Sequence, residues 1–277
     1  QLAAAQQFDN TFFSISHSES ASIDPQHRLL LEVGYDAVHG AGMRFRGVSG
    51  SNISVLVGIM NTDFVEFIDS QSVYAATGTQ ISIASGRISF ALGVHGACLT
   101  IDTACSSTLV ALEIGTSSCR SNASDSAVVC AANLLLSPRL FSLFASAGML
   151  SPDGRCKTFD GRANGYVRAE SIGALTLERA TARCQPNVSC CMVRADGRSA
   201  SLTAPNGEAQ KLMIAAALAS SANTCLYYAE AHGTGTALGD PTEIAALLGM
   251  LDARGQSCTT SLKSKVGHSE PAAGFVG

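Results

Sequence analysis

The sequence lacks any long hydrophobic run. Its longest apolar stretch, from Met213 to Ala219, is far shorter than the about 18 residues that cross a bilayer, so no membrane span is predicted. The first residues, QLAAAQQFDN, include no initiator Met, no basic segment and no apolar run. We therefore expect no signal or transit peptide in this chain, and expect the natural start to lie outside it.

Charged residues are also scarce. Only 14% of the residues are charged, the formal net charge is −4, and basic residues cluster only in pairs such as Arg44/Arg46, Arg194/Arg198 and Lys263/Lys265. A protein that binds nucleic acid normally presents a continuous basic surface. Nucleic acid is therefore not expected as a partner.

Closely spaced metal-ligand pairs are missing as well. The chain has 10 cysteines, but the spacings between Cys98 and Cys130 supply no CxxC pair, and no HxxxH pair occurs, so no metal site is predicted. The chain is long, lacks a secretory signal and carries Cys190 directly before Cys191. Reduced thiols are the better interpretation. We expect an intracellular protein, and the sequence leaves its compartment, cytoplasm or organelle, unknown.

What remains is a composition suited to a large α/β fold, since 46% of the 277 residues are hydrophobic. Asp24 and Pro25 suit the start of a helix, and the apolar run ISVLVGI at 53–59 is typical of a buried strand. No repeat or low-complexity linker occurs, so we expect one continuous unit. The remaining expected elements are strands near 99–102, 127–131, 173–177 and 226–229, and helices near 25–38, 106–116, 208–219 and 241–251.

Cys105 lies where the expected strand at 99–102 turns sharply into a helix. Leu109, Val110, Leu112 and Ile114 have spacings that predict a buried helix. At the start of such a helix, exposed N–H groups and the helix dipole favour a thiolate. The same N–H groups can hold the oxyanion of a thioester. Any other cysteine is more simply a small buried hydrophobe.

Two of the 6 histidines lie in loops rich in small residues. His232 follows the expected strand at 226–229 in EAHGTGT, and His268 ends the segment KSKVGH. In open α/β sheets, loops that follow strands are where sites form. Ordinary core or surface roles are expected for the others, His17, His27, His39 and His95.

The His232 loop has an alternative interpretation as a dinucleotide-binding turn. Gly233, Gly235 and Gly239 form GxGxxxG, one residue longer than the fingerprint. We also expect the carboxylate of Asp240 to cap the following helix, where it would occupy the N–H groups that a pyrophosphate needs. Both points disfavour a dinucleotide. A serine hydrolase is disfavoured because no GxSxG elbow occurs.

Taken together, the chain resembles the β-ketoacyl synthase (ketosynthase) domains of modular, type I polyketide synthases, in the thiolase superfamily. The resemblance runs through nearly the whole chain. The segments that carry it, in order, are DPQHRLLLEVGYDA, TGTQISIASGRISFALG, TIDTACSSTLVAL, SAGMLSPDGRCKTFDGRANGYVRAE, DGRSASLTAPNGEAQ, YAEAHGTGTALGDPTE and KSKVGHSEPAAG.

The resemblance implies a thiolase-like fold of doubled α/β/α/β/α layers, incomplete at both ends. Residues 1–277 would be a partial domain, mostly the N-terminal half, with the C-terminal half starting at about 180. It further implies a homodimer, adjacent polyketide synthase domains, and substrates carried on the phosphopantetheine of an acyl carrier protein, with no cofactor bound directly. Polyketide synthesis is favoured over fatty acid synthesis.

The resemblance also implies roles for individual residues. Cys105 would take the acyl chain as a thioester, while His232 and His268 would assist decarboxylation of a malonyl-type extender and stabilise the enolate. Lys263 would supply positive charge near His268, and Glu270 is a candidate partner for Lys263. Thr234, Thr236 and Asp240, in the His232 loop, are candidates for supporting the site.

The chain departs from the family pattern at a few positions. Ala97 and Cys98 replace the usual Pro-Ser, Glu113 replaces a common His, and Lys265 replaces the usual Asn. Other departures are Ala169 and Ser171, which replace glycines, Arg194-Ala195, which replaces Asn-Gln, and a short region at 180–194. An alternative hypothesis is therefore a catalytically silent ketosynthase-like scaffold or gatekeeping domain.

Overall fold

The computed structural model describes all residues except 1–6, 45–46, 70, 180–185, 222–227 and 251–257. It divides into two compact units, of which the first comprises Gln1–Arg139, Ala169–Gln185 and Ser269–Val276. The second comprises Leu140–Arg168, Pro186–His268 and Gly277. Each unit is assembled from separate stretches of chain, so no linker marks the division in the sequence.

The first unit is built on a four-stranded sheet of order β2-β1-β3-β4. Its strands are β1 (Ile53–Gly58), β2 (Cys98–Ile101), β3 (Ser126–Asn133) and β4 (Ser171–Glu178). β1 is parallel to both β2 and β3, while β4 is antiparallel to β3. Every residue of β1 and β3 is buried, as their largely apolar sequences predict.

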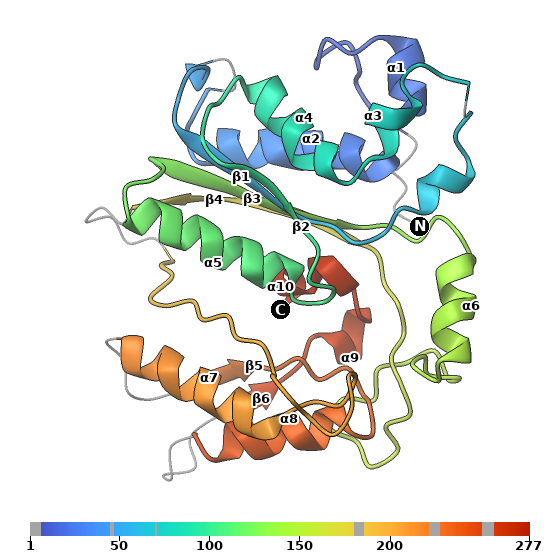
Figure 1. Cartoon of the computed structure of the whole chain (residues 1–277), viewed down its shortest axis with the longest axis vertical. Helices are drawn as coiled ribbons and strands as arrows, with labels where there is room; N and C mark the ends of the chain where they lie inside the picture. The colour runs from blue at the N-terminus through green and yellow to red at the C-terminus, as the bar shows by residue number, and fades with distance from the viewer. Residues whose placement is uncertain (1–6, 45–46, 70, 180–185, 222–227, 251–257) are drawn as a thin grey trace. The chain divides into compact units, whose positions relative to one another are not determined.

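Helices cover both faces of this sheet (Figure 1). α2 (Pro25–Gly40) and α4 (Ser82–Leu92) lie on one face and α5 (Ser107–Arg120) on the other. The predicted start of α2 is confirmed, because the Asp24 side chain accepts a hydrogen bond from the Gln26 N–H at 2.8 Å. The unit's short helices are α1 (His17–Ser22), η3 (Asp63–Glu66), α3 (Ala75–Thr79), η4 (Glu270–Ala272) and α10 (Ala273–Val276).

The buried face of α5 differs from the one predicted. Its buried residues are Ser107, Thr108, Ala111, Gly115, Thr116 and Cys119. Leu109 is 51% exposed, and Val110, Leu112 and Ile114 are only half-buried. A Cβ on Gly115 would lie 3.1 Å from a methyl group of Leu56 in β1. Because small residues form its buried face, α5 can pack very close to the sheet.

The second unit contains a two-stranded parallel sheet, β5 (Tyr228–Glu230) and β6 (Cys258–Thr260). α7 (Gly207–Ser220) and α8 (Gly239–Leu248) pack against each other. Ala229, Ala231 and Leu247 form a small core against which Ile214 and Ile244 pack.

The predicted strand at 226–229 and helix at 241–251 correspond to β5 and α8, although 226–227 and 251 lie outside the described residues. α6 (Arg139–Ser146), β6 and α9 (Lys263–Val266) were not predicted; all three are short, and short elements carry little periodicity. In the part of the chain that the structure describes, no helix combines the length and the apolar character needed to cross a membrane.

Candidate active site

Cys105 lies in the tight turn between β2 and α5, two residues before the helix begins. Ala104 has a φ of +53°, and its N–H donates to Asp102 Oδ1 at 3.0 Å. The Ser107 hydroxyl closes the turn, because it accepts from the Thr103 N–H at 2.9 Å and donates to the Ala104 carbonyl at 2.7 Å. The predicted arrangement of strand, sharp turn, cysteine and helix is confirmed, and Cys105 is half-buried.

The first turn of α5 is held closely on two sides. A Cβ on Gly58, the last residue of β1, would lie 3.0 Å from the Thr108 nitrogen, and one on Gly274 would lie 2.9 Å from both Thr108 Cβ and Leu109 Cγ. The Thr108 hydroxyl donates to the Pro271 carbonyl at 2.5 Å. The turn that carries Cys105 therefore rests on rigid secondary structure.

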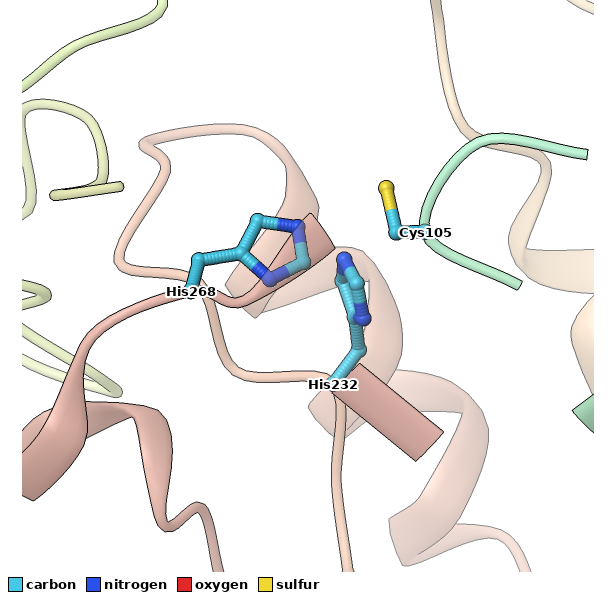
Figure 2. Close-up of side chains that lie close together, drawn as sticks. All are labelled: Cys105, His232 and His268. Atoms are coloured by element: carbon cyan, nitrogen blue, oxygen red, sulfur yellow. The ribbon is translucent and has the colours of Figure 1, made fainter. Parts of the chain in front are cut away.

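His232 and His268 lie together in the second unit. Their ring centroids are 5.2 Å apart and the ring planes meet at 88° (Figure 2). The ring of Tyr166 also contacts His268 edge-on, at 5.1 Å and 81°. The backbone N–H of His268 donates to the Val167 carbonyl at 2.8 Å, and the backbones of Arg168 and His268 form an isolated parallel β-bridge. His268 is thus fixed by its backbone and by two neighbouring rings.

The backbone of His232 is held by a carboxylate that the sequence analysis missed. Glu243 Oε1 accepts from the His232 N–H at 2.6 Å, and Oε2 accepts from the Gly233 N–H at 2.9 Å. The carbonyls of these residues accept hydrogen bonds from Ser261 Oγ at 3.1 Å and Thr158 Oγ1 at 2.5 Å, respectively. The only sign of this role in the sequence was the presence of a carboxylate, Glu243, in the helix that follows the His232 loop.

Asp240 does not cap α8, contrary to the prediction. The N-cap position is Leu238, which makes no side-chain cap hydrogen bond. Instead Asp240 Oδ1 accepts from the N–H groups of Gly235 and Thr236 at 3.0 and 3.2 Å, and Oδ2 accepts from the Phe159 N–H at 2.9 Å. The Asp240 carboxylate thus points back into the His232 loop, where it supplies acceptors for two backbone N–H groups.

The same hydrogen bonds argue against a dinucleotide in this loop. Its N–H groups already bind Glu243 and Asp240, and these carboxylates would repel a phosphate. Gly235, with a φ of +83°, approaches the Lys157 nitrogen so closely that a Cβ would lie 2.5 Å from it. Packing therefore accounts for this glycine. Of the other predicted supporting residues, Thr234 is buried, and the Thr236 hydroxyl accepts from the N–H at 239 at 3.2 Å.

Lys263, the first residue of α9, is buried beside the two histidines. Burial, and then the charge of Lys263, lowers the pKa of His232 from 6.5 to about 4. For His268 burial is again the main cause, and the neighbouring imidazole, Lys263 and Arg168 add to it, so that its pKa falls to about 3. His232 is exposed to solvent and His268 is buried, so burial lowers the pKa of His268 more strongly. Both rings are uncharged at neutral pH.

A second carboxylate fixes the segment that carries Lys263. Glu230 Oε1 accepts from the Leu262 N–H at 2.6 Å, directly before α9, and Oε2 accepts from the Thr260 hydroxyl at 2.8 Å. Glu270 is buried in the first unit with a φ of +46°. Its pairing with Lys263 stays a prediction.

Two family models match the chain. "Beta-ketoacyl synthase, N-terminal domain" matches residues 1–183, and "Beta-ketoacyl synthase, C-terminal domain" matches residues 187–277. The chain belongs to the β-ketoacyl synthase family. The resemblance expected from the sequence is thereby confirmed.

Curated relatives of this β-ketoacyl synthase chain are polyketide synthases. It is 41% identical over 288 residues to a phenolphthiocerol/phthiocerol polyketide synthase of Mycobacterium tuberculosis, covering 98% of the chain and 13% of that protein. It is 38% identical over 298 residues to the compactin nonaketide synthase, polyketide synthase component, of Penicillium citrinum, covering 98% of the chain and 10% of that protein. The chain thus spans a small part of the length of these relatives.

Solved structures agree on the fold. The ketosynthase from module 6 of the bacillaene synthase of Bacillus subtilis 168 matches with a TM-score of 0.87 and 33% identity, covering 100% of this chain and 50% of that chain. The ketosynthase domain OzmH KS7 from the oxazolomycin system of Streptomyces albus JA3453 matches with a TM-score of 0.86 and 33% identity, covering 97% and 49%. The expected thiolase-like α/β fold is confirmed.

Proposed function

We propose that this chain catalyses the decarboxylative condensation of thioesters in polyketide synthesis. The observation that carries the proposal is the pair of uncharged imidazoles, His232 and His268, in edge-on contact beside the buried cation Lys263. Membership in the β-ketoacyl synthase family and the polyketide synthase relatives support it.

In the first half of the reaction, Cys105 attacks an acyl thioester. The thiolate displaces the carrier thiol, and the acyl group becomes bonded to Cys105 Sγ. The position of Cys105 just beyond the N-terminus of α5, two residues before the helix begins, supports this role, because the helix dipole favours the thiolate. N–H groups of the same turn would donate hydrogen bonds to the negatively charged oxygen of the tetrahedral intermediate.

In the second half, a malonyl-type thioester loses its carboxylate as CO₂. The electron pair of the broken carbon–carbon bond moves toward the thioester oxygen, where uncharged His232 and His268 donate hydrogen bonds to the developing enolate. The enolate carbon then attacks the acyl carbon on Cys105, and the thiolate of Cys105 leaves. Lys263 stabilises the negative charge that appears as CO₂ departs.

Chain continuity supports the action of the cysteine and the histidines on one substrate. The residues that follow His268 include Pro271 and Gly274, which pack on the first turn of α5. Cys105 lies two residues before that helix begins.

Both substrates would arrive on the phosphopantetheine arm of an acyl carrier protein, with no cofactor held by this chain. The relatives are large polyketide synthases of which the chain covers 10–13%. Neighbouring synthase domains are therefore proposed as partners.

We also propose a homodimer that forms through the edge of the four-stranded sheet. β2 is the last strand on its side of the sheet in the part of the chain that the structure describes. Cys98 and Leu99 of β2 are exposed, and Phe90 of the neighbouring helix α4 is 88% exposed. An exposed apolar edge strand is a natural site for pairing with a second copy.

The function is tested by incubating the chain with an acyl-carrier thioester and measuring the intact mass of the protein. We expect one acyl group on the wild type, one on the matched Cys258→Ala variant of an exposed cysteine in β6, and none on Cys105→Ala. Acylation of Cys105→Ala to the wild-type extent would contradict the role of Cys105. Acylation without any CO₂ release from malonyl carrier would instead favour the silent scaffold.

A further inference from the structure

Three residues with sulfur-containing side chains follow one another in the second unit, outside the site described above. They are Cys190, Cys191 and Met192. Both cysteines carry thiols and are half-buried, and Met192 is half-buried as well. The two cysteines lie in the stretch at 180–194 that departs from the family pattern. The proposed condensation gives this sulfur cluster no role.

The backbone around the sulfur cluster is irregular. Residues 186–197 form neither a helix nor a strand. In a strand, neighbouring side chains point to opposite faces, but here the Cys190 thiol lies 3.5 Å from the Cys191 carbonyl oxygen, to which it donates. The end of the segment is anchored, because the Asp196 carbonyl accepts from Asn206 Nδ2 at 2.8 Å. The Cys190 thiol is therefore turned toward the residue that follows it.

The two neighbouring cysteines are better suited to sharing an ion than to forming a disulfide with each other. Neighbouring Cα atoms are about 3.8 Å apart, whereas the Cα atoms of a disulfide are usually at least about 4.4 Å apart. A direct bond between neighbours is therefore strained. An ion between the sulfurs lengthens the bridge, since each metal–thiolate bond spans about 2.3 Å in zinc sites.

The chemistry of the three side chains selects the ion. Thiolates and thioethers are soft ligands that favour Cu(I), whereas hard ions prefer oxygen. Zinc is bound by Cys, His, Asp and Glu, so a thioether beside two thiols fits Cu(I) better than zinc. The CxxC and HxxxH patterns considered in the sequence do not include adjacent cysteines.

We propose that Cys190, Cys191 and Met192 form a binding site for one Cu(I) ion. Each thiol releases its proton to solvent as its sulfur binds the ion, while the thioether binds without losing a proton. Copper enters and stays as Cu(I), so no electron is transferred. The site goes beyond the proposed function and does not depend on it.

The first test is an anaerobic titration with Cu(I) in competition with bathocuproine disulfonate, whose Cu(I) complex is coloured. We expect Cys190→Ala and Cys191→Ala each to bind one Cu(I) per chain fewer than the wild type. Met192→Leu should bind the same number of ions as the wild type, one of them more weakly. The matched control is Cys258→Ala, which removes an exposed cysteine that has no neighbouring cysteine and should bind as the wild type does.

A second readout locates the pair of thiols without copper. Phenylarsine oxide joins two thiols through its arsenic with loss of one water, and intact mass detects the added group. In excess β-mercaptoethanol, which removes arsenic held by a single thiol, we expect the group to stay on the wild type and on Cys105→Ala. It should be absent from Cys190→Ala and from Cys191→Ala.

The variants also show which result would overturn the site. Wild-type Cu(I) binding by Cys190→Ala or by Cys191→Ala would contradict it, as would retention of the arsenic group by either variant. Unchanged Cu(I) affinity in Met192→Leu would remove Met192 from the site. Urea unfolding midpoints equal to that of the wild type are expected for all these substitutions at 190–192, so that a lost ion reports a lost ligand.

Discussion

At the scale of single residues, the site depends on keeping two imidazoles uncharged. Burial and the nearby cations hold the pKa of His268 at about 3, far below 6.5. An uncharged imidazole keeps one N–H group, which can donate a hydrogen bond to an enolate oxygen. The same cations that would stabilise the enolate thus also keep the histidines in their working form.

The lowered pKa of His268 predicts a loss of stability in acid. Below pH 6.5 the unfolded chain binds a proton at this residue, whereas the folded chain does so only near pH 3. The free energy of unfolding therefore falls as the pH drops below 6.5, by about 2 kcal/mol between pH 7 and pH 5 from this group. His268→Asn should lose this part of the pH dependence, measured by urea unfolding at the two pH values.

The matched control for this comparison is His95→Asn, at an exposed position. It should keep the full loss between pH 7 and pH 5. An equally steep loss of stability in His268→Asn would show that His268 is not held uncharged in the folded protein.

At the scale of elements, the position of Cys105 is set by how closely α5 approaches the sheet. A Cβ on Gly58 would lie 3.0–3.1 Å from the backbone and side chain of the first turn of α5. Gly58→Val is therefore expected to displace this turn. We predict a loss of about 1–3 kcal/mol in the free energy of unfolding and slower acylation of Cys105, measured by denaturant unfolding and intact mass.

Gly86→Ala is the control, because nothing lies within 4 Å of a Cβ at that position in α4. It should acylate at the wild-type rate and be more stable by about 0.5–1 kcal/mol, as alanine favours a helix interior. Unchanged acylation and stability in Gly58→Val would contradict the close seating of α5.

The elements also show what the sequence could and could not predict. The turn at Cys105 and the loop positions of His232 and His268 follow from strand, turn and helix patterns in the sequence alone. The buried face of α5 could not be predicted in this way. The apolar residues Leu109 and Val110 predict that large side chains form the buried face of this helix. The structure instead buries Ser107, Ala111 and Gly115, and close packing of this kind depends on distances between elements.

The role of α8 is a second example. Asp240 was predicted to cap its helix, and Glu243 was not singled out. Both carboxylates instead accept hydrogen bonds from the histidine loop. Spacing along the helix shows that they share one face, but which N–H groups they meet depends on the path of a loop that periodicity does not describe.

At the scale of the whole molecule, the two family matches are not identical to the two compact units. The matches divide the chain near residue 185, whereas the second unit includes Leu140–Arg168 and the first includes Ser269–Val276. Each unit thus takes a segment from the other half of the sequence. Such exchange makes the folding of either half dependent on the other.

The proposed dimer is a property of the whole molecule, and Leu99→Lys tests it. Leu99 is 43% exposed on the edge strand β2. A lysine there would place like charges together at a two-fold interface and oppose strand pairing. We expect sedimentation velocity to show a dimer for the wild type and a monomer for Leu99→Lys.

Leu202→Lys serves as the control, because Leu202 is fully exposed in the second unit. It should sediment as a dimer. A wild-type monomer, or a dimer that persists in Leu99→Lys, would contradict assembly through this edge.

The most direct test of the central claim is the condensation itself. The chain is supplied with acyl carrier and malonyl carrier, and the β-ketoacyl product and the acyl state of Cys105 are measured together by mass spectrometry. We predict product from the wild type and none from Cys105→Ala, while His232→Ala and His268→Ala accumulate acyl-Cys105 without product. Wild-type amounts of β-ketoacyl product from any of these three variants would contradict the account.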